Sequence, residues 1–216
     1  MPKDGHVEQE TLAAATYGWL MQGQTVPMGV GSADGVLFDR HLLACLISIA
    51  RAETHQPLTH ALGLDRASLQ ALLLVMFPHA LGLLSGLEGV EDSGEDAIEE
   101  EDLRDLLIEH GDGSVGLSEM LALMIARRSL ASNHLWQDLG LRERAELTAL
   151  MGRHFPGLAE ANSSNMKWKK FFYRELCQRE GVVICKSPNC EVCEDFKECF
   201  GEENGPALLV TYDSKI

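Results

Sequence analysis

Residues 65–78, DRASLQALLLVMFP, determine the fold class of this chain. The apolar side chains at Leu69, Leu72, Leu73 and Met76 recur at the three- and four-residue spacing that places them on one face of a helix. An aspartate stands directly before the segment as an N-cap, and a proline ends it. The segment therefore predicts an amphipathic helix rather than a strand.

The same periodicity recurs through the first three quarters of the sequence. Strand-like runs are scarce, and only Val182–Ile184 and Leu208–Tyr212 alternate in the way a strand requires. The chain is therefore predicted to be mostly α-helical, with a helical bundle-like body. The further predicted helical segments are Phe38–Ile49, Leu103–His110, Met120–Ile125 and Leu147–His154.

Composition limits the classes of function. The 216 residues are 45% apolar and carry a formal net charge of -15, so a globular core is expected and a basic nucleic-acid or membrane footprint is not. The apolar runs 42–50 and 71–77 are too short to span a bilayer. Residues 1–8 lack the apolar stretch of a secretory signal, which leads us to expect a cytoplasmic protein.

Charge divides the chain into parts. Residues 1–165 contain 24 acids and 10 bases, whereas residues 166–216 contain 9 acids and 8 bases. We expect the acidic run at 91–105 to be a solvated loop that leads into a helix N-terminus. The predicted parts are an acidic helical body at 1–161, a C-terminal metal-binding element at 162–203 and a tail at 204–216.

A basic and aromatic helix is predicted directly after the turn-forming residues 162–165, with Asn165 as its N-cap. One face of this helix is apolar and is expected to pack into the core. The opposite face is basic. The apolar face consists of Trp168, Phe171, Phe172 and Leu176, and the basic face of Lys167, Lys170 and Arg174.

Four cysteines follow this helix within fifteen residues, at Cys185, Cys190, Cys193 and Cys199. Thiolates are soft ligands, and so short a C-x4-C-x2-C-x5-C segment can direct all four at one metal centre. The first two intervals match those of plant-type ferredoxins, which favours an iron–sulfur cluster. Structural zinc, which normally takes two short knuckles, and a redox thiol switch remain open on spacing alone.

The C-terminal part of the chain resembles the NifQ family of nitrogen-fixation proteins. The resemblance covers residues 130–203 and is specific because the aromatic-basic helix directly precedes this cysteine spacing. It is carried by His134–Gly140, Arg153–Pro156, Met166–Tyr173, the four-cysteine motif and Cys199–Gly201.

The resemblance implies a molybdenum donor for the iron–molybdenum cofactor of nitrogenase, located in the cytoplasm of a nitrogen-fixing bacterium. The cargo would be a molybdenum–iron–sulfur cluster on the four cysteines, and the partners would be dinitrogenase reductase and the cofactor scaffold complex. As a separate hypothesis from the residues themselves, the nearby bases compensate the charge of the cluster or attract molybdate. These bases are Lys167, Lys169, Lys170, Arg174 and Lys186.

Three further side chains are candidate metal ligands: His154, His134 and Cys177. The competing interpretation of His154 is a favourable position at a helix C-terminus, and that of Cys177 is a small buried apolar residue. No nucleophile–base motif is present, so we expect a carrier and not an enzyme. The alternative function is a zinc-stabilised helical adaptor without metal-transfer activity.

Overall fold

The computed structural model describes residues 3–24, 35–113, 116–181, 193 and 195–209. Within these ranges the secondary structure is helical and no strand occurs, which confirms the expectation of a mostly α-helical chain. None of the helices in the described part of the chain has the length and apolarity needed to span a lipid bilayer.

The helices of the described residues differ in length and in the length of the connections between them. They are α1 (Lys3–Met21), α2 (Gly35–Ala52), α3 (Leu58–Leu62), α4 (Arg66–Met76), the 3₁₀ helix η1 (Pro78–Leu84), α5 (Glu100–Glu109), α6 (Leu117–Ser129), α7 (Leu135–Asp138), α8 (Arg144–His154), α9 (Pro156–Ala161), α10 (Trp168–Arg179) and α11 (Phe196–Phe200).

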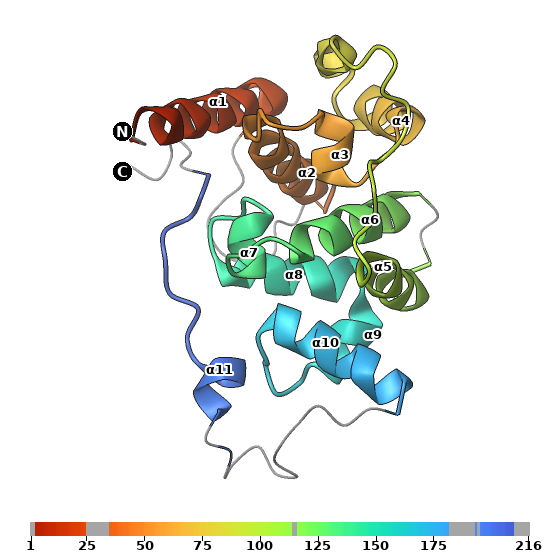
Figure 1. Cartoon of the computed structure of the whole chain (residues 1–216). Coiled ribbons are helices and arrows are strands. Elements are labelled where there is room, and N and C mark those ends of the chain that lie inside the picture. The colour runs from red at the N-terminus through yellow and green to blue at the C-terminus, as the bar shows by residue number, and fades with distance from the viewer. Residues whose placement is uncertain (1–2, 25–34, 114–115, 182–192, 194, 210–216) are drawn as a thin grey trace.

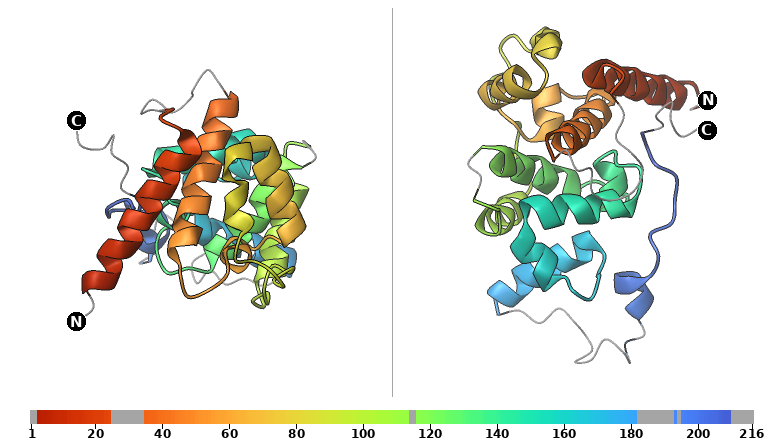
Figure 2. Two further views of the ribbon diagram at one scale, coloured as in Figure 1. Left: turned by 90° about the horizontal axis from the view of Figure 1, so that it is seen from above. Right: turned by 180° about the vertical axis from the view of Figure 1, so that it is seen from behind.

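The chain is built in tiers that follow the sequence (Figure 1). Helices α1–α4 form one end of the molecule, α5–α8 the middle, and α9 and α10 the other end. Helix α2 packs against α1 and α3, α3 against α6, and α5 against both α6 and α10. After α11 the chain turns back along the molecule toward α1, as the view from behind also shows (Figure 2).

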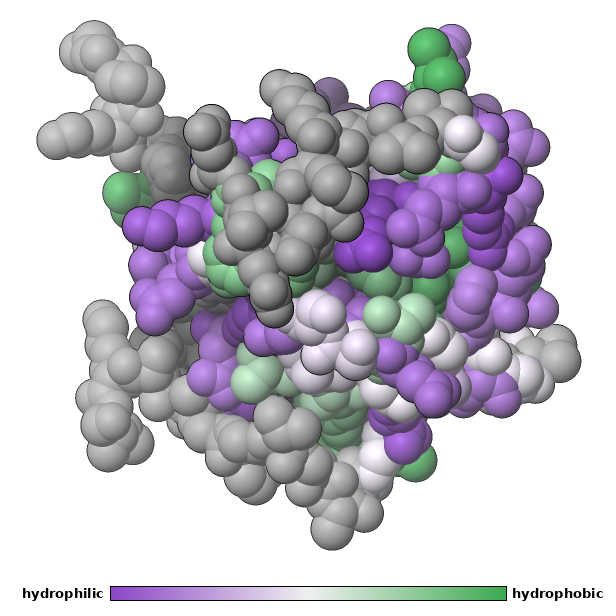
Figure 3. Space-filling view, turned by 90° about the horizontal axis from the view of Figure 1, so that it is seen from below, coloured by the Kyte–Doolittle hydropathy of each residue, from purple (hydrophilic) through white to green (hydrophobic). Residues whose placement is uncertain are grey.

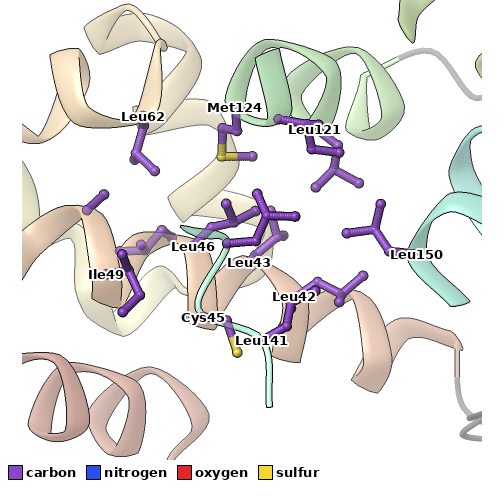
Figure 4. Close-up of a cluster of buried hydrophobic side chains, with 14 of the residues drawn as sticks. Leu42, Leu43, Cys45, Leu46, Ile49, Leu62, Leu121, Met124, Leu141 and Leu150 are labelled. Carbon is purple, nitrogen blue, oxygen red and sulfur yellow. The ribbon is translucent and has the colours of Figure 1, made fainter. Parts of the chain in front are cut away.

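Helix α2 is the centre of the core. Its residues 41–50 are all buried, because neighbouring helices cover it on every side and a helix in that position must be apolar around its whole circumference. Its leucines lie between Leu62 of α3, Met124 of α6 and Leu150 of α8 (Figure 4). The same core cluster extends to Phe172 of α10 and Leu209, so the aromatic face of α10 packs inside as predicted.

The predicted helical segments lie in helices of the structure, except that α5 ends at Glu109 and His110 takes its C-cap position. The N-cap at Asp65 is confirmed, since its side chain accepts a hydrogen bond from the Ser68 amide at 2.7 Å. Helix α4 ends at Met76, two residues before Pro78, because the residue preceding a proline is disfavoured in the helical conformation.

The predicted N-cap at Asn165 is wrong, because α10 begins at Trp168 and Lys167 occupies the cap position. Asn165 is in the left-handed conformation at φ 56°, with its side-chain oxygen bound to Arg144 at 3.0 Å. Asn162 closes the turn instead, since its side chain bonds both the amide and the carbonyl of Met166. The polar residues of this junction therefore fold the turn and do not cap the helix.

The acidic run at 91–105 is more engaged than the solvated loop that we expected. Arg127 of α6 binds Glu100 at 2.7 Å and Asp96 at 3.3 Å, and it also donates to the carbonyl of Ser93. Glu100 is consequently only 2% exposed. A single arginine with several donors thus folds this acidic segment back onto α6.

The two candidate strands are not represented by any strand in the described residues. Val182–Ile184 lies outside them, as do residues 210–212 of the second candidate. Leu208 and Leu209 are described without strand pairing, and Leu209 is buried. We call residues 201–209 the C-terminal strap, because they run from α11 along the body and end in this buried leucine (Figure 1).

Candidate metal site

The structure describes two of the four motif cysteines. Cys199 lies in α11 and Cys193 just before it, and both are half-buried. No disulfide joins the described cysteines. Cys185, Cys190 and the candidate base Lys186 lie outside the described residues.

Helix α11 is a single short turn. The carbonyl of Cys193 accepts a hydrogen bond from the Phe196 amide at 3.1 Å. The rings of Phe196 and Phe200, one helical turn apart, stack at 4.7 Å. None of its five residues is buried, and this element therefore lies at the edge of the core and not inside it.

A backbone hydrogen bond joins Cys199 to the start of α10. The Lys167 amide donates to the Cys199 carbonyl at 2.8 Å, and the Lys167 ammonium group lies 3.3 Å from the Lys197 carbonyl. The start of α10 and the end of α11 are thus fastened together, although 32 positions separate Lys167 from Cys199. The last motif cysteine consequently has a defined position on the body.

The bases predicted to support the site differ in their surroundings. Lys169 is already paired, because its ammonium group binds the buried carboxylate of Asp138 and the Ala131 carbonyl. Lys170 and Arg174 are exposed on the outer face of α10. Seen from the end where α10 and α11 lie, the described surface is mainly hydrophilic with smaller apolar areas (Figure 3). Lys170 and Arg174 therefore remain accessible to an anion.

His154 is held inside the body. Its ring lies 2.9 Å from the Asp39 carboxylate and 3.3 Å from the Ser118 hydroxyl, and the residue is only 3% exposed. Burial alone would raise the pKa of Asp39, but hydrogen bonds from His154 and Arg153 outweigh it and lower that pKa. The structure thus gives His154 a partner in the core and does not bring it to Cys193 or Cys199.

His134 and Cys177 lie nearer the C-terminal element. His134 precedes α7, and its Nδ1 lies 3.3 Å from the carboxylate of Glu203 in the strap. Cys177 is half-buried on α10. Among the residues that the structure describes, no three histidine, cysteine or acidic side chains gather closely enough to hold a metal ion.

The strap is attached to the body at three points. The Glu203 carboxylate binds Arg144 of α8 at 2.5 Å, the Pro206 carbonyl accepts from the Gln137 amide group at 2.7 Å, and Leu209 enters the core. None of these residues was predicted to support the site. Pairs such as Arg144 and Glu203, 59 positions apart, leave no local pattern in a sequence.

The arrangement offers soft thiol ligands at the surface of a packed helical scaffold. Cys193 and Cys199 are partly accessible, one is fixed through its backbone, and exposed cations lie on the adjoining helix. Such a donor set suits a thiophilic metal or an iron–sulfur unit, and an edge position permits exchange with a partner.

Comparisons with known proteins connect this chain with one family. The family model described as NifQ matches residues 42–201. The "Protein NifQ homolog" of Sinorhizobium fredii is 42% identical over 171 residues, which are 78% of this chain and 74% of that protein. "Protein NifQ" of Azotobacter vinelandii is 40% identical over 152 residues, 66% of this chain and 78% of its own length.

A third relative matches a shorter region more closely. "Protein NifQ" of Klebsiella pneumoniae is 56% identical over 81 residues, 37% of this chain and 48% of that protein. No solved structure matches the chain significantly. The family match begins at Leu42, so the similarity extends well beyond the region from residue 130 onward in which the motifs had suggested it.

Proposed function

This chain belongs to the NifQ family, and from that premise we propose that it carries molybdenum on an iron–sulfur cluster and donates it for assembly of the iron–molybdenum cofactor of nitrogenase. The cluster is cargo and not a resident cofactor. Its proposed ligands are Cys185, Cys190, Cys193 and Cys199. The proposed role is binding and release, with no catalysed reaction.

The observation that carries this proposal is the placement of Cys199. The residue is fixed by the hydrogen bond from the Lys167 amide, yet it belongs to a helix with no buried residue. A carrier needs both properties, because the ligand must be positioned for loading and the cargo must be reachable for transfer. A thiol in the core, such as the fully buried Cys45, would hold a metal that no partner could reach.

The chemistry of loading follows from the ligands. Each thiol must lose its proton to bind, so cluster binding releases protons and is favoured as pH rises toward the thiol pKa. Thiolate-bound clusters carry negative charge, and the exposed cations Lys170 and Arg174 on α10 can offset it. These cations also provide a local attraction for molybdate in a strongly acidic chain.

The proposed recipients are dinitrogenase reductase and the scaffold complex for the cofactor. The first 165 residues contribute -14 of the net charge of -15, which provides an acidic body on which a basic partner face can dock. Contacts of this kind between exposed charges weaken with added salt. Complex formation that is insensitive to ionic strength would contradict this part of the proposal.

The test is elemental analysis of protein purified without oxygen, for molybdenum, iron and zinc, together with a visible absorption spectrum. We expect iron and molybdenum with visible absorbance in the wild type, and loss of both in Cys190→Ala and Cys199→Ala. Cys177→Ala is the matched control, since this thiol is also half-buried but lies outside the motif. If the Cys177→Ala variant retains its metal, Cys177 is not a required ligand.

A different metal content would support the alternative function, a zinc-stabilised helical adaptor. About one zinc per chain without visible absorbance would overturn the donor proposal, because zinc is redox-silent and colourless. The protein would then be a helical adaptor with a structural zinc knuckle. Protein reconstituted anaerobically with iron and sulfide provides the control for cluster loss during purification.

A further inference from the structure

Arg144, at the start of α8, joins two segments that flank the metal site. Its Nη1 binds the Glu203 carboxylate of the strap at 2.5 Å. Its Nη2 donates to the Asn165 carbonyl at 3.1 Å, the Asn165 side-chain oxygen at 3.0 Å and the Met166 carbonyl at 3.0 Å. One guanidinium group therefore holds both the strap and the turn before α10.

Both segments lead directly to the hydrogen bond that fixes Cys199. Met166 directly precedes Lys167, whose amide donates to the Cys199 carbonyl. Glu203 follows Cys199 by four residues. The donor and the acceptor of this bond are thus each attached, within a few residues, to the same arginine.

The Arg144–Glu203 ion pair is more buried than an ordinary surface contact. The Glu203 side chain is 4% exposed and that of Arg144 is 21% exposed, whereas the surface pair Arg179–Glu109 is 37% and 61% exposed. Exposed pairs contribute little to stability, but a buried carboxylate that loses its cation becomes strongly unfavourable. The strap is therefore held at Glu203 with a well-defined geometry.

We infer that Arg144 is a positioning residue for the metal site, which sets the position of Cys199 relative to α10 through Glu203 and the 165–166 turn. The inference about the apo chain stands on these contacts alone. Its consequence for the metal rests on the proposed function.

The planar guanidinium group is essential to this role. It directs donors to two sides at once, whereas a lysine ammonium is a single point of charge on a flexible stem. Arg144→Lys therefore keeps the charge but loses the connection between strap and turn. The comparison of Arg144→Lys with Arg144→Met separates geometry from simple charge compensation.

The first experiment follows amide hydrogen exchange in the apo protein. The Lys167 amide reports directly on its bond to Cys199, and the Leu46 amide in the centre of α2 reports on global opening. We expect Arg144→Met, Arg144→Lys and Glu203→Gln to speed Lys167 exchange about tenfold relative to Leu46, the effect of losing about one buried polar interaction. Glu202→Gln, which changes an exposed neighbour, is the matched control.

Three exchange results would reject a positioning role for Arg144. Lys167 exchange that rises only as much as Leu46 exchange means that Arg144 acts on the whole fold, and unchanged exchange means that it fixes nothing at the site. Full recovery in Arg144→Lys would show that charge alone suffices. Each of these outcomes rejects a positioning role.

The second experiment measures release of iron from reconstituted protein to a chelator. We expect release at least several-fold faster in Arg144→Lys and Glu203→Gln than in Glu202→Gln and wild type. Wild-type protein that binds no iron would reject the proposed function but leave the exchange result standing. Wild-type protein that binds iron, with equal release from all variants, would reject the metal-positioning role and leave the proposed function intact.

Discussion

The carboxylate of Asp39 in α2 accepts a hydrogen bond from Nε2 of His154 in α8 at 2.9 Å, across 115 positions of sequence. Arg153 binds the same carboxylate through two nitrogens, at 2.7 and 2.8 Å. The Asp39 and His154 side chains are 8% and 3% exposed. One buried acid therefore fastens the central helix to the end of α8.

Replacing Asp39 should destabilise the whole chain. Asp39→Ala leaves a buried imidazole and one side of a guanidinium without their acceptor, and the expected loss is about 3 kcal/mol in the free energy of unfolding. Urea denaturation followed by circular dichroism measures it. Asp105→Ala, an exposed acid on α5, should stay within about 0.5 kcal/mol of wild type. Equal effects of the two substitutions would contradict a special role for the buried acid.

The pH dependence of stability follows from two buried carboxylates. Burial alone would raise the pKa of Asp39 and of Glu146, but hydrogen bonds from His154 and Arg153 to the first, and from His41 and Arg142 to the second, hold both pKa values below the ordinary range. The unfolded chain thus takes up these protons at higher pH than the folded protein. Their contribution is complete above the unfolded pKa of about 4 and is lost as pH falls through the folded pKa.

We therefore expect the urea midpoint to fall steeply as pH decreases below about 4 to 5. The double variant Asp39→Asn, Glu146→Gln should begin less stable and should show a shallower dependence, because neither amide titrates. Midpoints measured from about pH 7 to about pH 3 test this. A double variant with the wild-type slope would assign the acid sensitivity to other groups.

The aromatic face of α10 is expected to make the C-terminal helix part of one cooperative unit with the body. Phe172 is fully buried, and it packs with Trp168 and Phe171 in the same core cluster as α2. Phe172→Ala should cost about 3 to 5 kcal/mol and shift the unfolding transition as a whole. Tryptophan fluorescence and far-ultraviolet circular dichroism should then give the same midpoint. Two separate transitions would show that α10 unfolds independently.

The fold class and several helix boundaries could be predicted because they depend on local pattern. The leucine spacing after Asp65 and the proline at position 78 carry that information within one segment, and α4 has those limits. The aromatic face of α10 was predictable for the same reason. By contrast, the prediction of Asn165 as an N-cap failed, because Asn162 closes the turn onto Met166 and the distant Arg144 binds Asn165.

Candidate ligands could be named from the sequence, whereas the contacts that support Cys199 could not. The spacing of the four cysteines and the resemblance to the family identify them as candidate ligands from the sequence. The contacts that fix Cys199 connect α8, the turn before α10 and the strap, and each joins residues that no periodicity relates. For His154 the sequence left a metal-binding role open. The fold instead buries this side chain against Asp39.

Two adjacent lysines on α10 should have separable roles. Lys169 binds Asp138, whose side chain is 1% exposed, so Lys169→Met leaves a buried carboxylate without its cation and should cost about 3 kcal/mol or more. Lys170 is exposed, and Lys170→Met should change stability by less than about 0.5 kcal/mol. Urea denaturation of the two variants, with each the control for the other, measures this difference.

For metal loading we expect the reverse: substitution of Lys170 should matter and substitution of Lys169 should not. Lys170→Met combined with Arg174→Met removes two exposed charges beside the site, and it should slow anaerobic loading with iron, sulfide and molybdate at low ionic strength. The difference from wild type should shrink as salt is added, because exposed charges separated by more than about 10 Å are screened at 0.1 M salt. Lys169→Met should load at the wild-type rate wherever it is folded. A salt-independent defect in the double variant would indicate that these residues act through contacts and not through charge.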